Sequence, residues 1–223
     1  NAIYYQEVVV IVMSTGRVIT VDGTGTGTSR STLFGATTFV SFSPSNGQLI
    51  ICNGLDKPLL MDTDYSVDYL QDLATSSNTN TPIGKFCATH YGYTIIAGDP
   101  LAISTIHISA RNASGTYQGD PDPNDAVTMN LGVYVPEGSS EITGIASYRD
   151  RLVVFFESCS IPVELGIYTD AVHTPTVIEG AMVLFGAVSH RGVQALGDDV
   201  LFPDGFGVNS ITRTTLTSSI RPE

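Results

Sequence analysis

The chain has 223 residues, with ten basic and twenty-two acidic side chains, so its formal net charge is −12 at pH 7. Such a surface repels nucleic-acid phosphates, which excludes a protein that holds DNA on a basic patch. Hydrophobic residues make up 42% of the chain, enough for a core. The longest apolar run, residues 8–13, is far shorter than the roughly 20 residues of a membrane-spanning helix.

Short runs of β-branched and aromatic residues, bounded by Gly, Asn, Asp and Pro, occur along the whole chain and predict strands. The first hairpin is expected where residues 6–13 and 17–22 flank the turn that ends at Gly16. A second is expected between residues 39–42 and 48–52, because the Asn46-Gly47 pair between them tolerates positive φ. Further strands are predicted at residues 58–62, 85–90, 93–97, 105–109, 127–131, 142–148, 152–157, 161–165, 181–188, 200–203 and 208–212.

The remaining segments are predicted to be loops. Flexible polar loops are expected at about residues 23–32, 74–82 and 111–125. The best helix candidate, residues 66–73, is barely two turns long, so no convincing amphipathic helix is predicted.

The strand pattern repeats along the chain. Three gapless alignments carry the repeat: residues 88–96 onto 146–154, 47–51 onto 92–96, and 150–154 onto 198–202. A period of about 40–50 residues with three or four strands in each unit indicates a β-propeller. We therefore predict an all-β fold over residues 1–223, a single β-propeller-like array of three- to four-stranded antiparallel meanders, with a β-sandwich as the alternative. Four to five units fit this length, which leaves open that the chain is part of a longer one.

One apolar run is singled out as a structural element. It comprises Leu152, Val153, Val154, Phe155 and Phe156. A strand that is apolar on both faces must be buried on both, so the run is predicted to be a central strand of one blade. Either Phe155 or Phe156 is expected to pack against the neighbouring blade.

Sites for metals and cofactors are sparse in the sequence. Asp120, Asp122 and Asn124 have the i, i+2, i+4 spacing of a calcium loop, but the glycine and the bidentate glutamate of an EF-hand are missing, so a solvated turn is favoured. Cys87 and His90 are three apart on a predicted strand and should face opposite sides, which makes them a poor metal pair. No cofactor motif or catalytic signature is found.

The three cysteines, Cys52, Cys87 and Cys159, are odd in number and widely spaced. This pattern predicts neither a disulfide framework nor a zinc site, and it fits reducing surroundings.

Three segments carry a resemblance to a known family. They are residues 53–62, residues 142–157 with 160–163, and residues 185–202 with 204–211. Their turns and strands are similar to those of the β-propeller proteins of short-tailed bacteriophage tails, the tail nozzle (tail tubular protein B) and the related tail hub. The chain departs from the family pattern in lacking Trp, in carrying Pro203 at a strand position, and in stopping at Glu223 where the family usually continues.

The resemblance implies a structural virion protein and not an enzyme. Such proteins form an oligomeric ring, usually hexameric, that extends the portal channel and conducts DNA during ejection. The implied partners are copies of the chain, a portal-adaptor protein and tail fibre or needle proteins, with transient, non-specific contact to DNA in transit. The implied location is the virion tail, after assembly in the host bacterial cytoplasm, with no cofactor and no membrane span.

An alternative from another class is a propeller-type binding module or a glycan-active enzyme. A glycoside hydrolase needs two carboxylates about 5–10 Å apart. Asp150, Glu157, Glu164 and Asp204 are available, but nothing in the sequence pairs them.

Overall fold

The computed structural model describes residues 1–37, 39–72, 74–120, 125–136, 138, 140–165, 175–196 and 199–212. Within these residues the chain forms five antiparallel sheets, each built from strands that are consecutive in the sequence. The first sheet contains β1 (Ala2–Tyr5), β2 (Val8–Val12), β3 (Val18–Val21) and β4 (Gly27–Ser31). The second contains β5 (Ser41–Ser45), β6 (Gln48–Cys52), β7 (Leu59–Met61) and β8 (Val67–Tyr69).

The other three sheets follow the same order. The third contains β9 (Phe86–His90), β10 (Tyr93–Asp99), β11 (Ala102–Ile108) and β12 (Val127–Asn130). The fourth contains β13 (Gly144–Tyr148), β14 (Arg151–Phe155), β15 (Ser160–Glu164) and β16 (Thr176–Val177). The fifth contains β17 (Gln194–Leu196), β18 (Asp199–Pro203) and β19 (Val208–Ser210). Three short 3-10 helices, η1 (Gly132–Tyr134), η2 (Glu179–Ala181) and η3 (His190–Gly192), lie between them.

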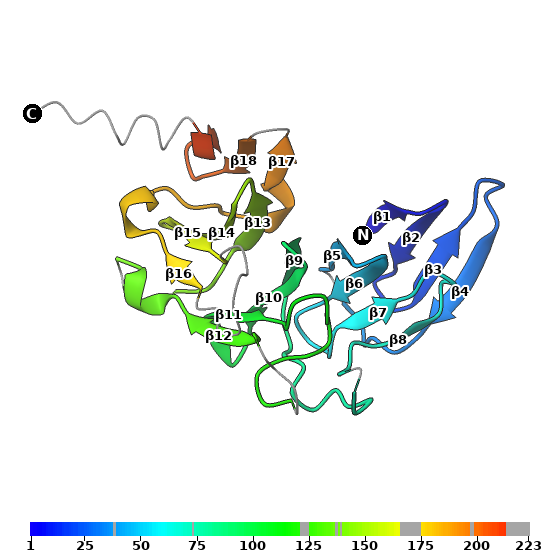
Figure 1. The fold of residues 1–223 in the computed structure, drawn as a ribbon. Helices are drawn as coiled ribbons and strands as arrows, with labels where there is room; N and C mark the ends of the chain where they lie inside the picture. The colour runs from blue at the N-terminus through cyan, green and yellow to red at the C-terminus, as the bar shows by residue number, and fades with distance from the viewer. Residues whose placement is uncertain are drawn as a thin grey trace, which may run out of the picture.

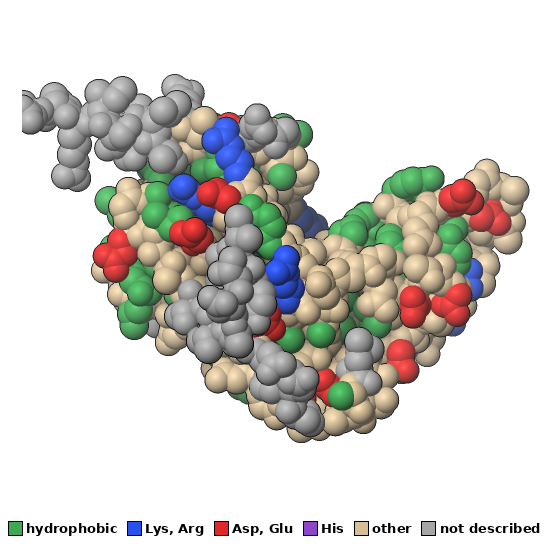
Figure 2. Space-filling view, in the orientation of Figure 1, with side chains coloured by type: hydrophobic (Ala, Val, Ile, Leu, Met, Phe, Trp, Pro, Cys, Tyr) green, Lys and Arg blue, Asp and Glu red, His purple; other side chains and the backbone are tan. Residues whose placement is uncertain are grey.

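The sheets follow one another around an arc, like the blades of a propeller, with the first strands on its concave side (Figure 1). The predicted β-propeller-like array is therefore confirmed, and the β-sandwich alternative does not describe the fold. The arc leaves a wide notch between the first and the fifth sheet (Figure 2). Near the concave side, the Arg191 guanidinium donates a hydrogen bond to Asn1 Oδ1 at 3.2 Å, so η3 contacts the N-terminal residue there.

The hairpin turns confirm the local sequence signals. Asn46 and Gly47 have φ values of 51° and 79°, as expected for an Asn-Gly turn between β5 and β6. Tyr91 and Gly92 take nearly the same values, 50° and 83°, in the equivalent turn between β9 and β10. The sequence repeat therefore marks the same hairpin in successive blades.

Several stretches differ from the prediction. Strands β1, β8, β16 and β17 were not predicted, and β8 lies within residues 66–73, the best helix candidate. Residues 23–32 were expected to be a loop, but β4 lies within them and pairs with β3. Its side chains are polar, as suits an exposed edge strand, and Arg30 Nε donates a hydrogen bond to Thr20 Oγ1 of β3 at 2.8 Å.

Residues 181–188 were expected to be a strand, but Val183 makes only a single β-bridge, to Ser160. This apolar stretch is a connection from the fourth to the fifth blade and is only partly buried: Ala187 joins the cluster between those blades, whereas Leu184 is 70% exposed.

Four hydrophobic clusters fill the four junctions between consecutive blades. The second strand of each central blade contributes to two of them. In β10, Ile95 packs in the cluster with the fourth blade, whereas Ile96 packs in the cluster with the second blade. In β14, Val154 packs in the cluster with the third blade, whereas Val153 packs in the cluster with the fifth blade. Two-sided burial of these strands explains their continuous apolar sequences.

Candidate functional site

The innermost strands are joined by hydroxyl side chains. Ser43 Oγ and Thr89 Oγ1 share a hydrogen bond of 2.9 Å between β5 and β9, and Ser45 Oγ and Thr94 Oγ1 share another of 2.9 Å. Between β9 and β13, His90 Nδ1 lies 2.7 Å from Ser147 Oγ. Small polar side chains let the strands converge near the axis while their polar atoms stay paired.

His90 and Cys87 face opposite sides of β9, as predicted. Cys87 lies in the cluster with Ile50 of the second blade, whereas His90 contacts Ser147 of the fourth. All three cysteines, Cys52, Cys87 and Cys159, are free and buried.

His190, in η3, is a second histidine near the axis. Its ring lies 4.8 Å from the Phe86 ring and 6.2 Å from the Phe39 ring, measured between centroids. Burial lowers the pKa of His190 from 6.5 to about 4, and the nearby charge of Lys85 lowers it in the same direction. Its Nδ1 has no hydrogen-bond partner among the described residues. The ring is therefore held neutral at pH 7.

We expect the stability of the fold to fall as the pH drops from about 6.5 towards 4, partly because of His190. In this window the unfolded chain binds a proton at His190 that the folded chain does not, which favours unfolding. Urea midpoints measured from pH 7 to pH 4 should therefore drop less in His190→Gln than in the wild type. Equal drops in the two proteins would show that this histidine does not titrate abnormally.

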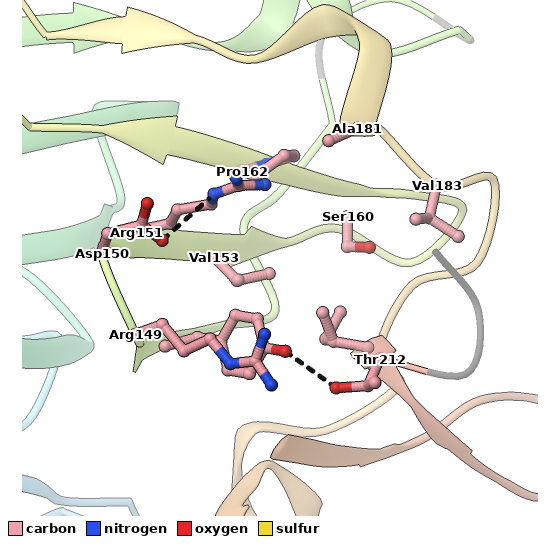
Figure 3. A pocket seen from close by; sticks show the side chains of 11 residues that line it. Arg149, Asp150, Arg151, Val153, Ser160, Pro162, Ala181, Val183 and Thr212 are labelled. Carbon is pink, nitrogen blue, oxygen red and sulfur yellow. Dashed lines mark hydrogen bonds and ion pairs between the residues drawn. The ribbon is translucent and has the colours of Figure 1, made fainter. Parts of the chain in front are cut away.

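The best-formed pocket lies between the fourth and the fifth blade and has a volume of about 500 Å³ (Figure 3). Its floor comes from the face of the fourth blade, with Val153 on β14 and Ser160 and Pro162 on β15. Its sides are formed by Ala181 and Val183 on one flank and by Ile211 and Thr212 on the other. The turn between β13 and β14, with Tyr148, Arg149, Asp150 and Arg151, completes the lining. This volume is within the range of small-ligand sites, about 300–1,000 Å³.

The pocket combines an apolar floor with charged groups from one turn. Arg151 Nε lies 3.3 Å from Asp150 Oδ1, and the Arg149 guanidinium lies over the Tyr148 ring at 5.2 Å. Tyr148 also shares a 2.7 Å hydrogen bond with Thr212, which ties the turn to the fifth blade. Within the described structure, Ser160 Oγ is buried without a hydrogen-bond partner. An unpaired buried hydroxyl is unfavourable, and a bound ligand could satisfy it.

The predicted structural run lies in the interior. All five of its residues are at most 2% exposed. Phe155 packs against Phe202 of the fifth blade, with ring centroids 5.1 Å apart, whereas Phe156 belongs to the cluster with the third blade.

The candidate calcium loop is only partly described. Asp120 closes a turn, with Oδ2 accepting from Tyr117 N at 2.8 Å and Oδ1 accepting from the Asn80 amide at 2.9 Å. Asp122 and Asn124 lie outside the described residues. Among the residues that the structure describes, no group of three or more His, Cys, Asp or Glu could hold a metal ion.

The pocket was not predicted from the sequence. Of the four carboxylates considered for a hydrolase, only Asp150 lines it. Its lining comes from four separate segments that meet only when two blades pack, so no local motif marks it. The one available signal was Arg149 and Arg151 on either side of Asp150, in a chain with only ten Lys and Arg.

Comparisons with known proteins show the fold. No family model matches the chain, and no curated protein matches it by sequence. Among solved structures, BamB from Moraxella catarrhalis is 17% identical, with a TM-score of 0.57 over 94% of this chain and 59% of that one. PorZ, a surface component of the type-IX secretion system of Porphyromonas gingivalis, is 14% identical, with a TM-score of 0.53 over 96% of this chain and 27% of PorZ. Streptogramin B lyase is 11% identical, with a TM-score of 0.52 over 90% of this chain and 63% of the lyase.

These neighbours are β-propeller proteins, so the chain is a β-propeller-type module. It spans less than two thirds of the length of each of them. No helix among the described residues is long and apolar enough to cross a membrane.

Proposed function

We propose that this module is a structural component of the tail of a short-tailed phage, either the nozzle or the hub. It assembles with copies of itself into a ring that extends the portal channel, and DNA passes through that ring during ejection. Its partners are a portal-adaptor protein and tail fibre or needle proteins. The observation that carries the assembly role is an uncovered apolar face on the first blade.

This open face consists of side chains from β1, β2 and β3 that point away from the second blade. Residues that are directly paired across strands share one face of the sheet. On this face, Val9 of β2 lies between Tyr4 of β1 and Val21 of β3. Ile11 of β2 likewise lies between Ala2 of β1 and Ile19 of β3. Tyr4 is 71% exposed and Val9 is 36% exposed. Hydrophobic side chains gather on the notch side of the arm that carries β1 and β2 (Figure 2). In the central blades the matching faces are buried, so this face has the chemistry of an interface between sheets.

Charge and sequence give further support. A net charge of −12 suits a conduit wall that DNA must pass without sticking. The three segments that resemble the phage family cover the turn and strand after β6, the hairpin of β13 and β14, and the region from η3 to β19.

Labelling of intact virions tests this proposal. Antibody raised against the chain, visualised by electron microscopy on particles of the phage that encodes it, should decorate the tail. Label confined to the capsid shell, or absent from disrupted and intact particles alike, would end the tail assignment.

A second candidate is a propeller-type binding module or a glycan-active enzyme. The pocket between the fourth and fifth blades favours the binding module, because Asp150 is the only carboxylate among its described lining residues and a glycoside hydrolase needs two. Asp150 lies in that pocket beside Arg151. Screening a glycan panel for binding and hydrolysis tests this candidate. Specific turnover that is lost in Asp150→Asn, while the melting temperature stays that of the wild type, would favour it over the tail role.

A further inference from the structure

The described lining of the pocket between the fourth and fifth blades is positively charged. Arg149 and Arg151 both belong to it, against a single carboxylate, Asp150. In the close-up view the two arginine side chains lie on either side of Val153 (Figure 3). The chain has a net charge of −12 and only ten Lys and Arg, so two arginines around one pocket favour a bound anion.

Both arginines keep N–H groups available for such an anion. Arg151 contacts Asp150 Oδ1 through Nε, at 3.3 Å, and this is its only ion pair within the described residues. The Arg149 guanidinium lies over the Tyr148 ring, 5.2 Å from the centroid, and has no ion pair in the described part of the chain. That contact positions the group without using its N–H donors. A planar guanidinium with available donors matches the two oxygens of a carboxylate.

The pocket also offers apolar walls. Val153 and Val183 are at most 5% exposed, so they are rigidly held by the blades behind them. A hydrated inorganic anion would leave these walls without contacts, whereas the hydrocarbon part of an organic anion packs against them. The volume of about 500 Å³ is sufficient for a small organic molecule. Five lining residues are apolar: Val153, Pro162, Ala181, Val183 and Ile211.

Ser160 adds one polar group to the pocket. It is a lining residue, yet it is only 1% exposed, so it lies at the deep end of the pocket. Its Oγ has no hydrogen-bond partner among the described groups. A buried hydroxyl without a partner is unfavourable, and an acceptor atom on a bound ligand would remove that cost.

We propose that this pocket binds a small organic carboxylate. The carboxylate accepts hydrogen bonds from Arg149 and Arg151, and a short apolar body packs between Val153 and Val183. An acceptor atom on that body receives a hydrogen bond from Ser160 Oγ. A neutral sugar would leave the two arginines without a counter-charge. This inference goes beyond the tail role, which needs no ligand in the pocket, and it gives the binding-module candidate a ligand class.

Binding of hexanoate to the full chain tests the inference. Hexanol and hexylamine are the comparison probes, because they keep the hydrocarbon chain but replace the carboxylate with a neutral or a positive group. In NMR spectra of valine-labelled protein, hexanoate should shift the methyl signals of Val153 and Val183, with a Kd of about 10 mM or lower. The other two probes should bind at least tenfold more weakly. Val9, which is 36% exposed on the open face, reports non-specific apolar binding and should not shift.

Arginine variants locate the carboxylate. The double variant Arg149→Gln, Arg151→Gln should weaken binding of hexanoate about tenfold or more, because charge-assisted hydrogen bonds are lost, and it should leave binding of hexanol unchanged. Arg17→Gln, at an exposed arginine of the first blade, is the matched control and should bind hexanoate like the wild type. Melting temperatures of the variants check that the fold is kept.

A second pair of probes tests the role of Ser160. At least one of 4-oxohexanoate and 5-oxohexanoate should bind about threefold or more tightly than hexanoate, because its ketone accepts a hydrogen bond from Ser160 Oγ. That gain should vanish in Ser160→Ala, while binding of hexanoate itself should stay the same. A gain that persists in the variant, or no gain with either ketone, would contradict the role given to Ser160.

Three results would each overturn the inference as a whole. They are no shift at Val153 and Val183 up to about 50 mM hexanoate, equal binding of hexylamine, and no effect of the double arginine variant. A shift at Val9 without one at Val153 would place the probe on the open face and count against the pocket in the same way. None of these results would change where antibody labels the virion, so the tail proposal is tested separately.

Discussion

Phe155→Ala is expected to leave the protein insoluble or unable to assemble. Phe155 is fully buried and packs against Phe202 across the junction of the fourth and fifth blades, with the two rings tilted by 45°. Truncating a buried Phe costs about 3–5 kcal/mol, a large share of the roughly 5–15 kcal/mol by which a typical domain is stable. Soluble yield and the urea midpoint of any soluble fraction measure the effect.

The matched control is Phe206→Ala, because Phe206 is 98% exposed and loses the same atoms. It should be as soluble and as stable as the wild type. If Phe155→Ala folds and assembles as well as Phe206→Ala, then β14 is peripheral and the assignment of the blades is wrong.

Gly16→Ala is expected to destabilise the first blade and its connection to the second. Gly16 has a φ of +82°, and a Cβ there would lie 2.2 Å from Gly35 O and 2.3 Å from Phe34 O. The left-handed backbone and the clash with backbone atoms together should cost about 2–5 kcal/mol. Chemical denaturation followed by circular dichroism measures the loss.

Gly25→Ala separates the two causes. Gly25 has nearly the same φ, +83°, but a Cβ there would meet nothing within 4 Å. This variant should lose only the conformational part, about 1–2 kcal/mol. Equal losses at the two glycines would mean that the segment at Phe34 and Gly35 does not press on the turn.

Local sequence signals were sufficient for most of the blades. The Asn46-Gly47 turn and the apolar runs at β6, β10 and β14 determine hairpins by φ preference and two-sided burial, so they could be predicted. Besides β4, the strands that were missed are β1, β8, β16 and β17, and the last two have weak signals. β16 is only Thr176–Val177, and the three residues of β17 are all exposed. The run at residues 181–188 connects two blades with only some of its apolar side chains buried, and hydrophobicity alone does not distinguish this from a strand.

The pocket and the open face could not be predicted for a different reason. Both depend on which blades lie next to one another and on where the arc stops. In the sequence, Ser160 looks like an ordinary strand residue. Only the packing of β15 near the fifth sheet, which has three described strands, reveals that its hydroxyl is buried without a described hydrogen-bond partner. The valines of β2 look like those of a central strand, yet Val9 lies on an uncovered face.

A cryo-electron microscopy reconstruction of the tail of the phage that encodes this chain tests the central claim most directly. The proposal predicts that the five-bladed arc fits the density of a ring around the DNA channel, with the open face at Tyr4 and Val9 covered by another β-sheet. A tail whose density contains no such arc, or an arc whose open face borders solvent, would contradict it.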